Sequence, residues 1–347
     1  MRSYNSSNPL HVAVTGANGF IGREVVRQAA AQSDWMFTRI VRHITERDAF
    51  LPAVDRTRAC GDIGPETNWL RTLRNVDVVI HTAARAHVLE EKNADPAAAF
   101  HATNVAGTRR LAEDASRAGV RRLIFLSTIG VHGDVTGPER NDALTEESPI
   151  APHTPYAASK RDAEIALHTH AAATSLETTI LRLPLVYGAS DAGDGRDIPG
   201  NLARLLKAVE RGVPLPLASL DNRRSLLSRA ALADLAIRCV TDPAAENATY
   251  LAADNDAIST SSLVRAIAAA NGNTARMFPV PASLLQTICV ALGRGAIARQ
   301  LTGSLRVNAA KARKELDWQP PTDTAAAVVH ALAKRRVPVD DPTSKRQ

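Results

Sequence analysis

Residues 10–22 read LHVAVTGANGFIG, and this stretch decides the fold. Leu10 to Thr15 predict a short apolar strand, and a helical pattern follows the glycines. Gly16 permits a sharp turn, Gly19 lets a pyrophosphate approach the backbone, and Gly22 lets the helix lie close to the sheet. A phosphate at this turn meets the positive end of the helix. In the order strand, turn and helix the glycines indicate dinucleotide binding; without that context they would be an ordinary turn.

Strands and helices alternate through the N-terminal half of the chain. This pattern predicts an α/β fold with a doubly wound parallel sheet, the Rossmann arrangement. The apolar strands read as continuous runs, which is typical of a sheet with helices on both faces. The candidate strands are 38–41, 76–81 and 123–127, and the candidate helices are 97–118 and 156–173.

The 347 residues fit one large domain with a smaller C-terminal α/β substrate lobe better than two independent domains. We expect the dinucleotide-binding domain over 9–180, with its core continuing into part of the C-terminal half. The substrate lobe is expected mainly over 181–330, and flexible tails are expected at 1–8 and 337–347.

Tyr156 and Lys160 stand four residues apart in the run Tyr-Ala-Ala-Ser-Lys, so a helix places them on one face. A tyrosine has a pKa of about 10 when unperturbed. A neighbouring ammonium, and a cationic nicotinamide if one binds, would lower that pKa towards a range useful for acid-base chemistry. Alone, the spacing is more often a surface pair than a catalytic one. The Tyr156–Lys160 spacing is a stronger indication of catalysis here because a dinucleotide-type glycine turn precedes it in the chain.

Further motifs follow in a fixed order along the chain, and together they resemble the extended short-chain dehydrogenases/reductases. The resemblance is to the NAD-dependent epimerase/dehydratase group, which acts on nucleotide sugars, and it runs from about Leu10 to Pro320. Within that group the chain is most similar to bacterial UDP-sugar 4-epimerases and 4-ketoreductases of polysaccharide biosynthesis. Besides the glycine turn, the matching segments are 61–62, 81–84, 104–108, 126–128, 156–160, 184–188, and 311–316 before Trp318.

The resemblance implies roles for named residues. The implied catalytic set is Thr128, Tyr156 and Lys160, with Ser127 as the fallback for Thr128 and Asn104 ordering backbone or water near Lys160. The implied cofactor-binding residues are Gly16, Asn18, Gly19, Phe20, Ile21, Gly22, Arg42, Asp62, Ile63, Ala83, Ala84 and Lys160. The implied substrate-binding residues are Asn201 and Arg224, the latter gripping the diphosphate with a guanidinium.

Cofactor choice depends on the end of the second strand. A carboxylate about 20 residues past the glycine turn binds the ribose 2'-hydroxyl of NAD. Here Ile40-Val41-Arg42-His43 carry no acid, and Arg42 could receive the 2'-phosphate of NADP instead. The alternative is that Arg42 covers the adenine or faces solvent. The sequence therefore favours NADP over NAD.

The catalytic set is common to epimerases, 4-ketoreductases and 4,6-dehydratases. Dehydratases of the group need an Asp-Glu pair after the threonine, and Ile129-Gly130 stand there, so that reaction is disfavoured. The missing acidic residue favours a UDP-4-keto-(6-deoxy)-hexosamine 4-reductase over a UDP-hexose or UDP-N-acetylhexosamine 4-epimerase. Leu185 replaces an asparagine found in many UDP-sugar epimerases, a departure that puts the usual UDP-galactose pocket in doubt. A reductase of another small ketone and a non-catalytic NAD(P)-binding scaffold remain open.

Composition limits the partners. Aromatic residues make up 4% of the chain, too little to stack many nucleic-acid bases, and the net charge of +6 comes from scattered basic residues. We therefore expect an anionic small substrate and no nucleic acid. Three cysteines argue against a disulfide framework and for a reducing, cytoplasmic setting. The sequence contains no run of some 18 uncharged apolar residues, so we expect no insertion into a membrane.

Three further expectations concern metal, mobility and assembly. Asp191, Asp194 and Asp197 lack the spacing of a calcium loop, so no metal is expected. The Gly- and Asp-rich loop 188–195 could act as a lid. By the resemblance, helices 97–118 and 156–173 form the faces of a homodimer.

Overall fold

The computed structural model describes residues 9–32, 34–45, 56–86, 95–134, 136, 143–189 and 200–333. Its centre is a seven-stranded sheet in the order β3-β2-β1-β4-β5-β6-β9, and every strand pairs parallel to its neighbours. The strands are β1 His11–Thr15, β2 Met36–Val41, β3 Arg56–Ala59, β4 Val78–His81, β5 Arg122–Thr128, β6 Glu177–Leu183 and β9 Ala248–Leu251. The strand order reverses between β1 and β4, which is where such sheets bind ligands.

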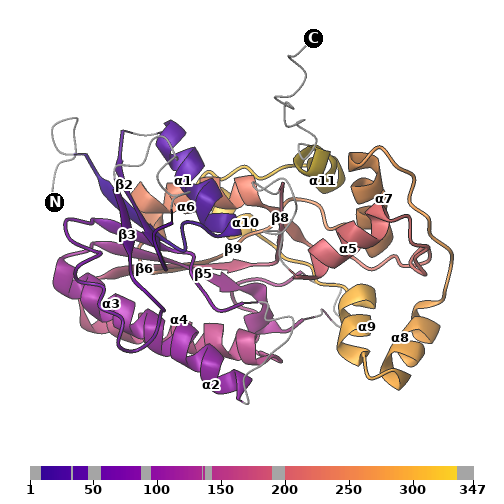
Figure 1. The fold of residues 1–347 in the computed structure, drawn as a ribbon, viewed down its shortest axis with the longest axis horizontal. Helices are drawn as coiled ribbons and strands as arrows, with labels where there is room; N and C mark the ends of the chain where they lie inside the picture. The colour runs from indigo at the N-terminus through magenta and orange to yellow at the C-terminus, as the bar shows by residue number, and fades with distance from the viewer. Residues whose placement is uncertain are drawn as a thin grey trace, which may run out of the picture.

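Helices cover both faces of the sheet (Figure 1). One face carries α1 and α6, and the other carries the long α3 and α4. The helices and short turns of the main body are α1 Phe20–Gln32, α2 Pro96–Phe100, η2 His101–Ala106, α3 Gly107–Ala118, η3 Ile129–His132, α4 Pro155–Ala173, α6 Arg229–Thr241, η4 Pro243–Ala245 and α10 Ala310–Glu315.

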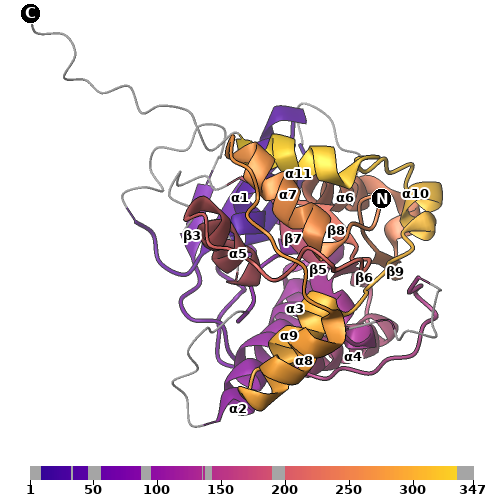
Figure 2. The same ribbon diagram turned by 90° about the vertical axis from the view of Figure 1, so that its right-hand side faces the viewer.

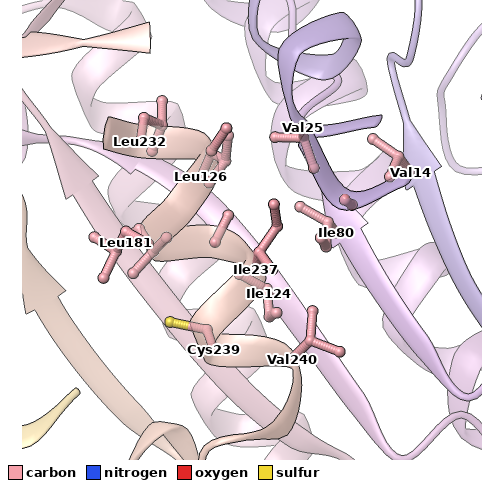
Figure 3. Close-up of a cluster of buried hydrophobic side chains, with 14 of the residues drawn as sticks. Val14, Val25, Ile80, Ile124, Leu126, Leu181, Leu232, Ile237, Cys239 and Val240 are labelled. Atoms are coloured by element: carbon pink, nitrogen blue, oxygen red, sulfur yellow. The ribbon is translucent and has the colours of Figure 1, made fainter. Parts of the chain in front are cut away.

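Side chains alternate between the two sheet faces, and each face forms its own core. Val14, Ile80, Ile124 and Leu181 point toward α1 and α6, as Figure 3 shows for the side packed on Leu232. The next residues along the same strands face α3 and α4, where the buried residues include Ala13, Val79, Phe125, Ile180, Leu111 and Leu167. Because both faces are buried, the central strands are largely apolar, with buried exceptions such as Arg39 on β2 and Arg182 on β6.

A second group of elements lies beyond the carboxyl end of the sheet. It contains a two-stranded parallel sheet, β7 Leu185–Tyr187 with β8 Leu226–Ser228. Its helices are α5 Gly200–Glu210, α7 Thr260–Ala270, α8 Ala282–Ala291, α9 Gly295–Thr302 and α11 Thr324–Ala333 (Figures 1 and 2). These elements share a separate core that includes Leu206, Ile267 and Val328. We call them the lobe.

The expected fold class is confirmed: the sheet is parallel and doubly wound, and a smaller lobe follows it. β9 and α6, from the C-terminal half, complete the main sheet and one of its helical layers. The division at residue 180 stays a prediction, and the tails 1–8 and 337–347 lie outside the described residues. One local feature was not expected. The helix at 97–118 contains a π-helical turn at His101–Ala106, so it runs as α2, η2 and α3.

Candidate active site

The glycine turn has no room for side chains. A Cβ on Gly22 would lie 2.3 Å from the carbonyl oxygen of Gly16, and one on Gly16 would lie 2.9 Å from the backbone of Ala83. Gly16 also has a φ of +65°, which other residues rarely adopt. The backbone therefore passes close to the start of α1, whose first amides have no partner within the helix. That geometry suits a pyrophosphate, and it places Gly16, Gly19 and Gly22 where the sequence predicted them.

Two residues of the turn are held by arginines from other elements. The side-chain oxygen of Asn18 accepts a hydrogen bond from Arg39, a buried arginine on β2, and its backbone oxygen accepts from Arg23 Nε at 2.7 Å. The ring of Phe20 lies under the Arg229 guanidinium, 4.9 Å from the ring centroid. Arg39 was missed by sequence reasoning, although a charged residue inside an apolar strand was a visible signal.

Arg42 and Asp62 lie at the same edge of the sheet and form an ion pair, with Arg42 Nε 3.0 Å from Asp62 Oδ1. Both side chains are largely exposed, so the pair contributes little stability. A methyl group of Ile63 fills the space next to Gly107 on α3. Ala83 and Ala84 follow β4 beside the glycine turn, and the Ala83 amide donates to the Thr15 hydroxyl at 3.4 Å. The predicted cofactor residues described here thus border one edge of the sheet.

Tyr156 occupies the first turn of α4. Thr154 caps this helix, since its hydroxyl accepts from the Ala157 amide at 3.1 Å, and Pro155 supplies the first helical residue. The Tyr156 ring packs edge-on against Phe100, with centroids 6.0 Å apart. Burial raises the pKa of Tyr156 to about 12. Desolvation is the cause of this rise, and the lowering of the Tyr156 pKa expected from Lys160 and a bound cationic nicotinamide stays a prediction.

Lys160 is buried one turn further along α4, and its Nζ lies 3.7 Å from the centroid of the Phe125 ring. Burial lowers the pKa of Lys160 to about 7, while Glu164 opposes that shift. His81 stacks on the same Phe125 ring, and Thr15 holds its Nδ1 at 2.6 Å. Burial, with Lys160 nearby, lowers the pKa of His81 to about 3, so this imidazole stays neutral. The ammonium is thus held against an aromatic face.

A buried ionic cluster lies one turn beyond Lys160 along α4. The Glu164 carboxylate accepts from Arg182 Nε at 3.2 Å and from Arg182 Nη2 at 2.8 Å. Arg182 Nη1 donates to His132 Nε2 at 2.9 Å, and His132 Nδ1 then donates to the carbonyl of Pro149. Sequence reasoning missed this cluster, although Glu164 continues the stripe of Tyr156 and Lys160 by one helical turn. It joins α4 to the ends of β5 and β6.

Ser127 and Thr128 face different surroundings at the end of β5. The Ser127 hydroxyl is buried and donates to Glu164. The Thr128 hydroxyl is partly exposed and accepts from the Gly130 amide at 3.1 Å. A Cβ on Gly130 would lie 3.3 Å from Thr128 Oγ1 and 3.4 Å from Ala157 Cβ, so Thr128 is close to the turn of α4 that carries Tyr156. This geometry favours Thr128 over Ser127 as the reacting hydroxyl.

Asn104 lies in the π-helical turn and joins two segments of the site. Its side chain accepts from the Arg85 amide at 2.8 Å and donates to the Arg85 carbonyl at 3.0 Å. It also donates to the Ser159 hydroxyl at 3.0 Å, directly before Lys160 on α4. A π-helical turn is common at functional sites because it re-aims one side chain. Asn104 therefore links the backbone after β4 to the turn of α4 that leads into Lys160.

The predicted substrate residues belong to the lobe. Arg224 is half-buried, its Nη1 donates to the carbonyl of Gly303 at 3.0 Å, and burial lowers its pKa. Asn201 stands in the first turn of α5, and the prediction about its side chain lies outside what the structure describes. Loop residues 190–199, with the three aspartates considered for calcium, also lie outside the described residues. Leu185 begins β7.

The described residues offer neither a cluster of metal ligands nor a membrane-spanning helix. They hold no group of three or more His, Cys, Asp or Glu side chains placed to bind a metal ion. Within the same ranges, no helix is long and apolar enough to cross a membrane. Cys60, Cys239 and Cys289 are all free thiols.

The buried charge of Lys160 predicts an unusual pH dependence. Between about pH 7 and 10.5 the unfolded chain binds more protons here than the folded chain, so the free energy of unfolding should rise with pH. Lys160→Met removes the cost of burying a charged ammonium. We expect it to stabilise the protein at pH 7 by about 1–2 kcal/mol and to flatten that rise with pH. Urea unfolding at pH 7 and pH 9.5 measures both effects, and a less stable variant would contradict the prediction.

Comparisons with known proteins agree with this geometry. A family model described as the NAD dependent epimerase/dehydratase family matches residues 12–253. A Vibrio cholerae protein named UDP-glucose 4-epimerase is 35% identical over 314 residues, which cover 90% of this chain and 92% of that protein.

Two solved structures share the fold. One is UDP-glucose 4-epimerase with UDP-glucose from Thermotoga maritima, with a TM-score of 0.73 and 18% identity, covering 94% of this chain and 99% of that one. The other is UDP-glucuronic acid 4-epimerase from Bacillus cereus in complex with NAD, with a TM-score of 0.72 and 17% identity, covering 94% and 98%. At these identities the likeness is one of fold.

Proposed function

The chain belongs to the NAD dependent epimerase/dehydratase family, and from this premise we propose that it is a UDP-sugar 4-epimerase. It is an NAD-dependent sugar-nucleotide enzyme of the short-chain dehydrogenase/reductase type. The observation that carries the proposal is the 35% identity, over 90% of this chain, to the protein named UDP-glucose 4-epimerase, since epimerases and reductases share the set of Thr128, Tyr156 and Lys160. The Vibrio cholerae relative supports epimerisation, and the reductase preferred from the sequence has no such support. The substrate is a UDP-hexose or UDP-N-acetylhexosamine.

In this proposal each residue has one task. The Tyr156 hydroxyl exchanges a proton with the sugar C4 hydroxyl, and Thr128 holds that oxygen in line. Lys160 holds the cofactor ribose and supplies positive charge near the phenol. Asn104 orders the two backbone segments that flank the site. Arg224 and Asn201 bind the diphosphate from the lobe.

The residues around the glycine turn fit NAD. The packed positions of Gly16 and Gly22 leave only backbone at the start of α1, which is the cradle that a pyrophosphate needs. Bound NAD would supply a hydride acceptor and donor at its nicotinamide. Asn18, Phe20 and Ile21 line the turn, Asp62 and Ile63 border the adenine side, and Ala83 and Ala84 form the wall beside β4. Elimination of water has no support, since Ile129 and Gly130 cannot transfer a proton.

A UDP-4-keto-(6-deoxy)-hexosamine 4-reductase is the second candidate. Leu185 in place of an asparagine and the lack of an acid after β2 favour it. Arg42, the residue expected to select NADP, is paired with Asp62, which weakens the case for that cofactor. The pair is exposed, so Arg42 could exchange Asp62 for a 2'-phosphate at small cost. NAD is therefore the proposed cofactor and NADP the alternative.

Cofactor retention separates the two reactions. The purified protein is denatured and any released nicotinamide cofactor is identified and quantified by mass spectrometry. We expect close to one NAD per chain, because an epimerase regenerates its cofactor in each turnover and need not release it. A protein that carries no cofactor and is stabilised against heat by NADPH, but not by NAD, would replace the epimerase with the reductase.

The remaining alternatives have weaker support. A reductase of another small ketone does not require Arg224 at its position in the lobe, and a non-catalytic scaffold does not require Thr128, Tyr156 and Lys160 together.

We infer a homodimer through the helices at 97–118 and 156–173, of which α4 carries the half-exposed Ile165. We also infer a cytoplasmic setting, because the three cysteines are free.

A further inference from the structure

Helices α8 and α9 form a hairpin at the edge of the lobe. Figures 1 and 2 both show the two helices side by side there. Gln286 Nε2 donates to Thr302 Oγ1 at 2.7 Å, which ties the helices to each other. Leu285 is buried and Cys289 is partly buried, and both pack on the core of the lobe. One face of α8 is thus fixed to the protein.

The other face of α8 is apolar and exposed. Leu284, Ile288 and Leu292 follow one another at every fourth residue, and they keep 50%, 46% and 68% of their surface accessible. Val290, 64% exposed, lies on a different side of α8, near Gly295 at the start of α9. From Ala282 to Gly293 no residue is charged. Single exposed apolar side chains are ordinary on a protein surface, but a contiguous row of them marks a binding surface.

The sequence segment that contains the hairpin carries charge of one sign. Between Asp256 and Glu315 the sequence contains eight Lys and Arg and no Asp or Glu, a net charge of +8 against +6 for the whole chain. Arg294 and Arg299 belong to the hairpin, and Arg276 and Arg306 stand on either side of it in the sequence. All four side chains are exposed. The apolar row therefore lies within a segment that attracts anions.

We propose that the α8–α9 hairpin docks this enzyme onto a lipid surface that carries anionic headgroups. Leu284, Ile288 and Leu292 would enter the boundary between headgroups and acyl chains, while Arg294 and Arg299 meet the headgroup phosphates. α8 has ten residues and is about 15 Å long, about half the thickness of a bilayer core, so it lies in the interface and does not span it.

The charge of this segment also argues against a second copy of the chain as the partner that docks on the hairpin. Two chains docked through this face would bring two acid-free, basic segments together, and like charges would oppose that contact. An anionic lipid surface has the complementary sign, and its acyl boundary accepts an uncharged apolar row without requiring a matching pocket. The proposal does not depend on which sugar nucleotide the enzyme converts.

The test is co-sedimentation of the full chain with vesicles of phosphatidylcholine alone and with 30% phosphatidylglycerol, roughly the anionic content at which basic segments bind. We expect binding to the mixed vesicles that weakens as salt rises. Ile288→Asp with Leu292→Asp should lower the partition coefficient by at least about tenfold. Arg294→Gln with Arg299→Gln should lower it by roughly fivefold for each arginine, and only on the anionic vesicles.

Matched controls carry the same changes elsewhere. Leu70→Asp alters an exposed leucine outside the hairpin, and Lys207→Gln with Arg211→Gln removes two exposed charges from the end of α5 and the residue that follows it. Both controls should bind like the wild type, and thermal unfolding verifies that every variant is folded. The proposal is overturned if the wild type stays in solution with anionic vesicles, or if the controls lose as much binding as the hairpin variants. It is also overturned if light scattering shows that the apolar substitutions dissociate a dimer without changing vesicle binding.

Discussion

Replacing Tyr156 with phenylalanine is expected to lower kcat by about a thousandfold or more while the affinity for NAD and for the UDP-sugar stays nearly unchanged. The substitution removes one oxygen from a ring that otherwise keeps its packing against Phe100. Because the proposed binding residues lie in the glycine turn and the lobe, the loss should fall on kcat and not on KM. Steady-state kinetics and calorimetric titration of NAD together measure this split.

Tyr250→Phe is the matched control. The Tyr250 hydroxyl is also hydrogen-bonded, to the carbonyl of Ala244 at 2.6 Å and to Glu315 at 2.9 Å, but it lies outside the proposed active site. This variant should lose about 1–2 kcal/mol of stability and retain full turnover. Unchanged turnover in Tyr156→Phe would remove Tyr156 from the catalytic set, and equal losses in both variants would indicate a structural effect.

Replacing Gly22 with alanine should have the largest effect on cofactor binding. The new methyl group would stand 2.3 Å from the carbonyl oxygen of Gly16 and 2.8 Å from the Cα of Ala17, so backbone must move. We expect a loss of about 3 kcal/mol in the free energy of unfolding. The affinity for NAD should fall by at least roughly a hundredfold, because the start of α1 leaves the position that a pyrophosphate requires.

Gly119→Ala separates stability from binding. Gly119 ends α3 with a φ of +77°, and no atom lies within 4 Å of the added methyl group. Only backbone strain opposes this substitution, so it should cost about 1 kcal/mol and leave NAD affinity unchanged. Urea unfolding and NAD titration on both variants provide the comparison. Normal NAD affinity in Gly22→Ala would show that the dinucleotide binds elsewhere.

Local sequence predicted the parts of the site whose geometry comes from one short segment. The glycine turn needs only a strand, small residues and a helix in succession, and the Tyr156–Lys160 spacing needs only a helix. Thr128 followed from the family resemblance, which implies a serine or threonine after this strand. The parallel sheet followed from alternation of elements. Each of these inferences uses neighbours within a few residues, so no long-range contact was needed.

Contacts between distant segments were not predicted. Arg39 reaches Asn18 from another strand. Asn104 was expected to order backbone or water near Lys160, but its partners Arg85 and Ser159 and its place in a π-helical turn were not predicted. The cluster of Glu164, Arg182 and His132 joins three elements that the sequence separates by up to fifty residues. A linear pattern assigns no partner to a buried charge, since the partner is chosen by how the sheet and helices pack.

The sequence by itself determined the class of this protein: a doubly wound sheet with a dinucleotide turn, and a Tyr and Lys on one helical face near a Thr. Only the tertiary structure decided the electrostatics of that face. Lys160 lies against the Phe125 ring, and burial lowers its pKa to about 7 while it raises the pKa of Tyr156 to about 12. The physical reason is that spacing along a helix fixes which residues are neighbours, whereas desolvation depends on every element packed around them.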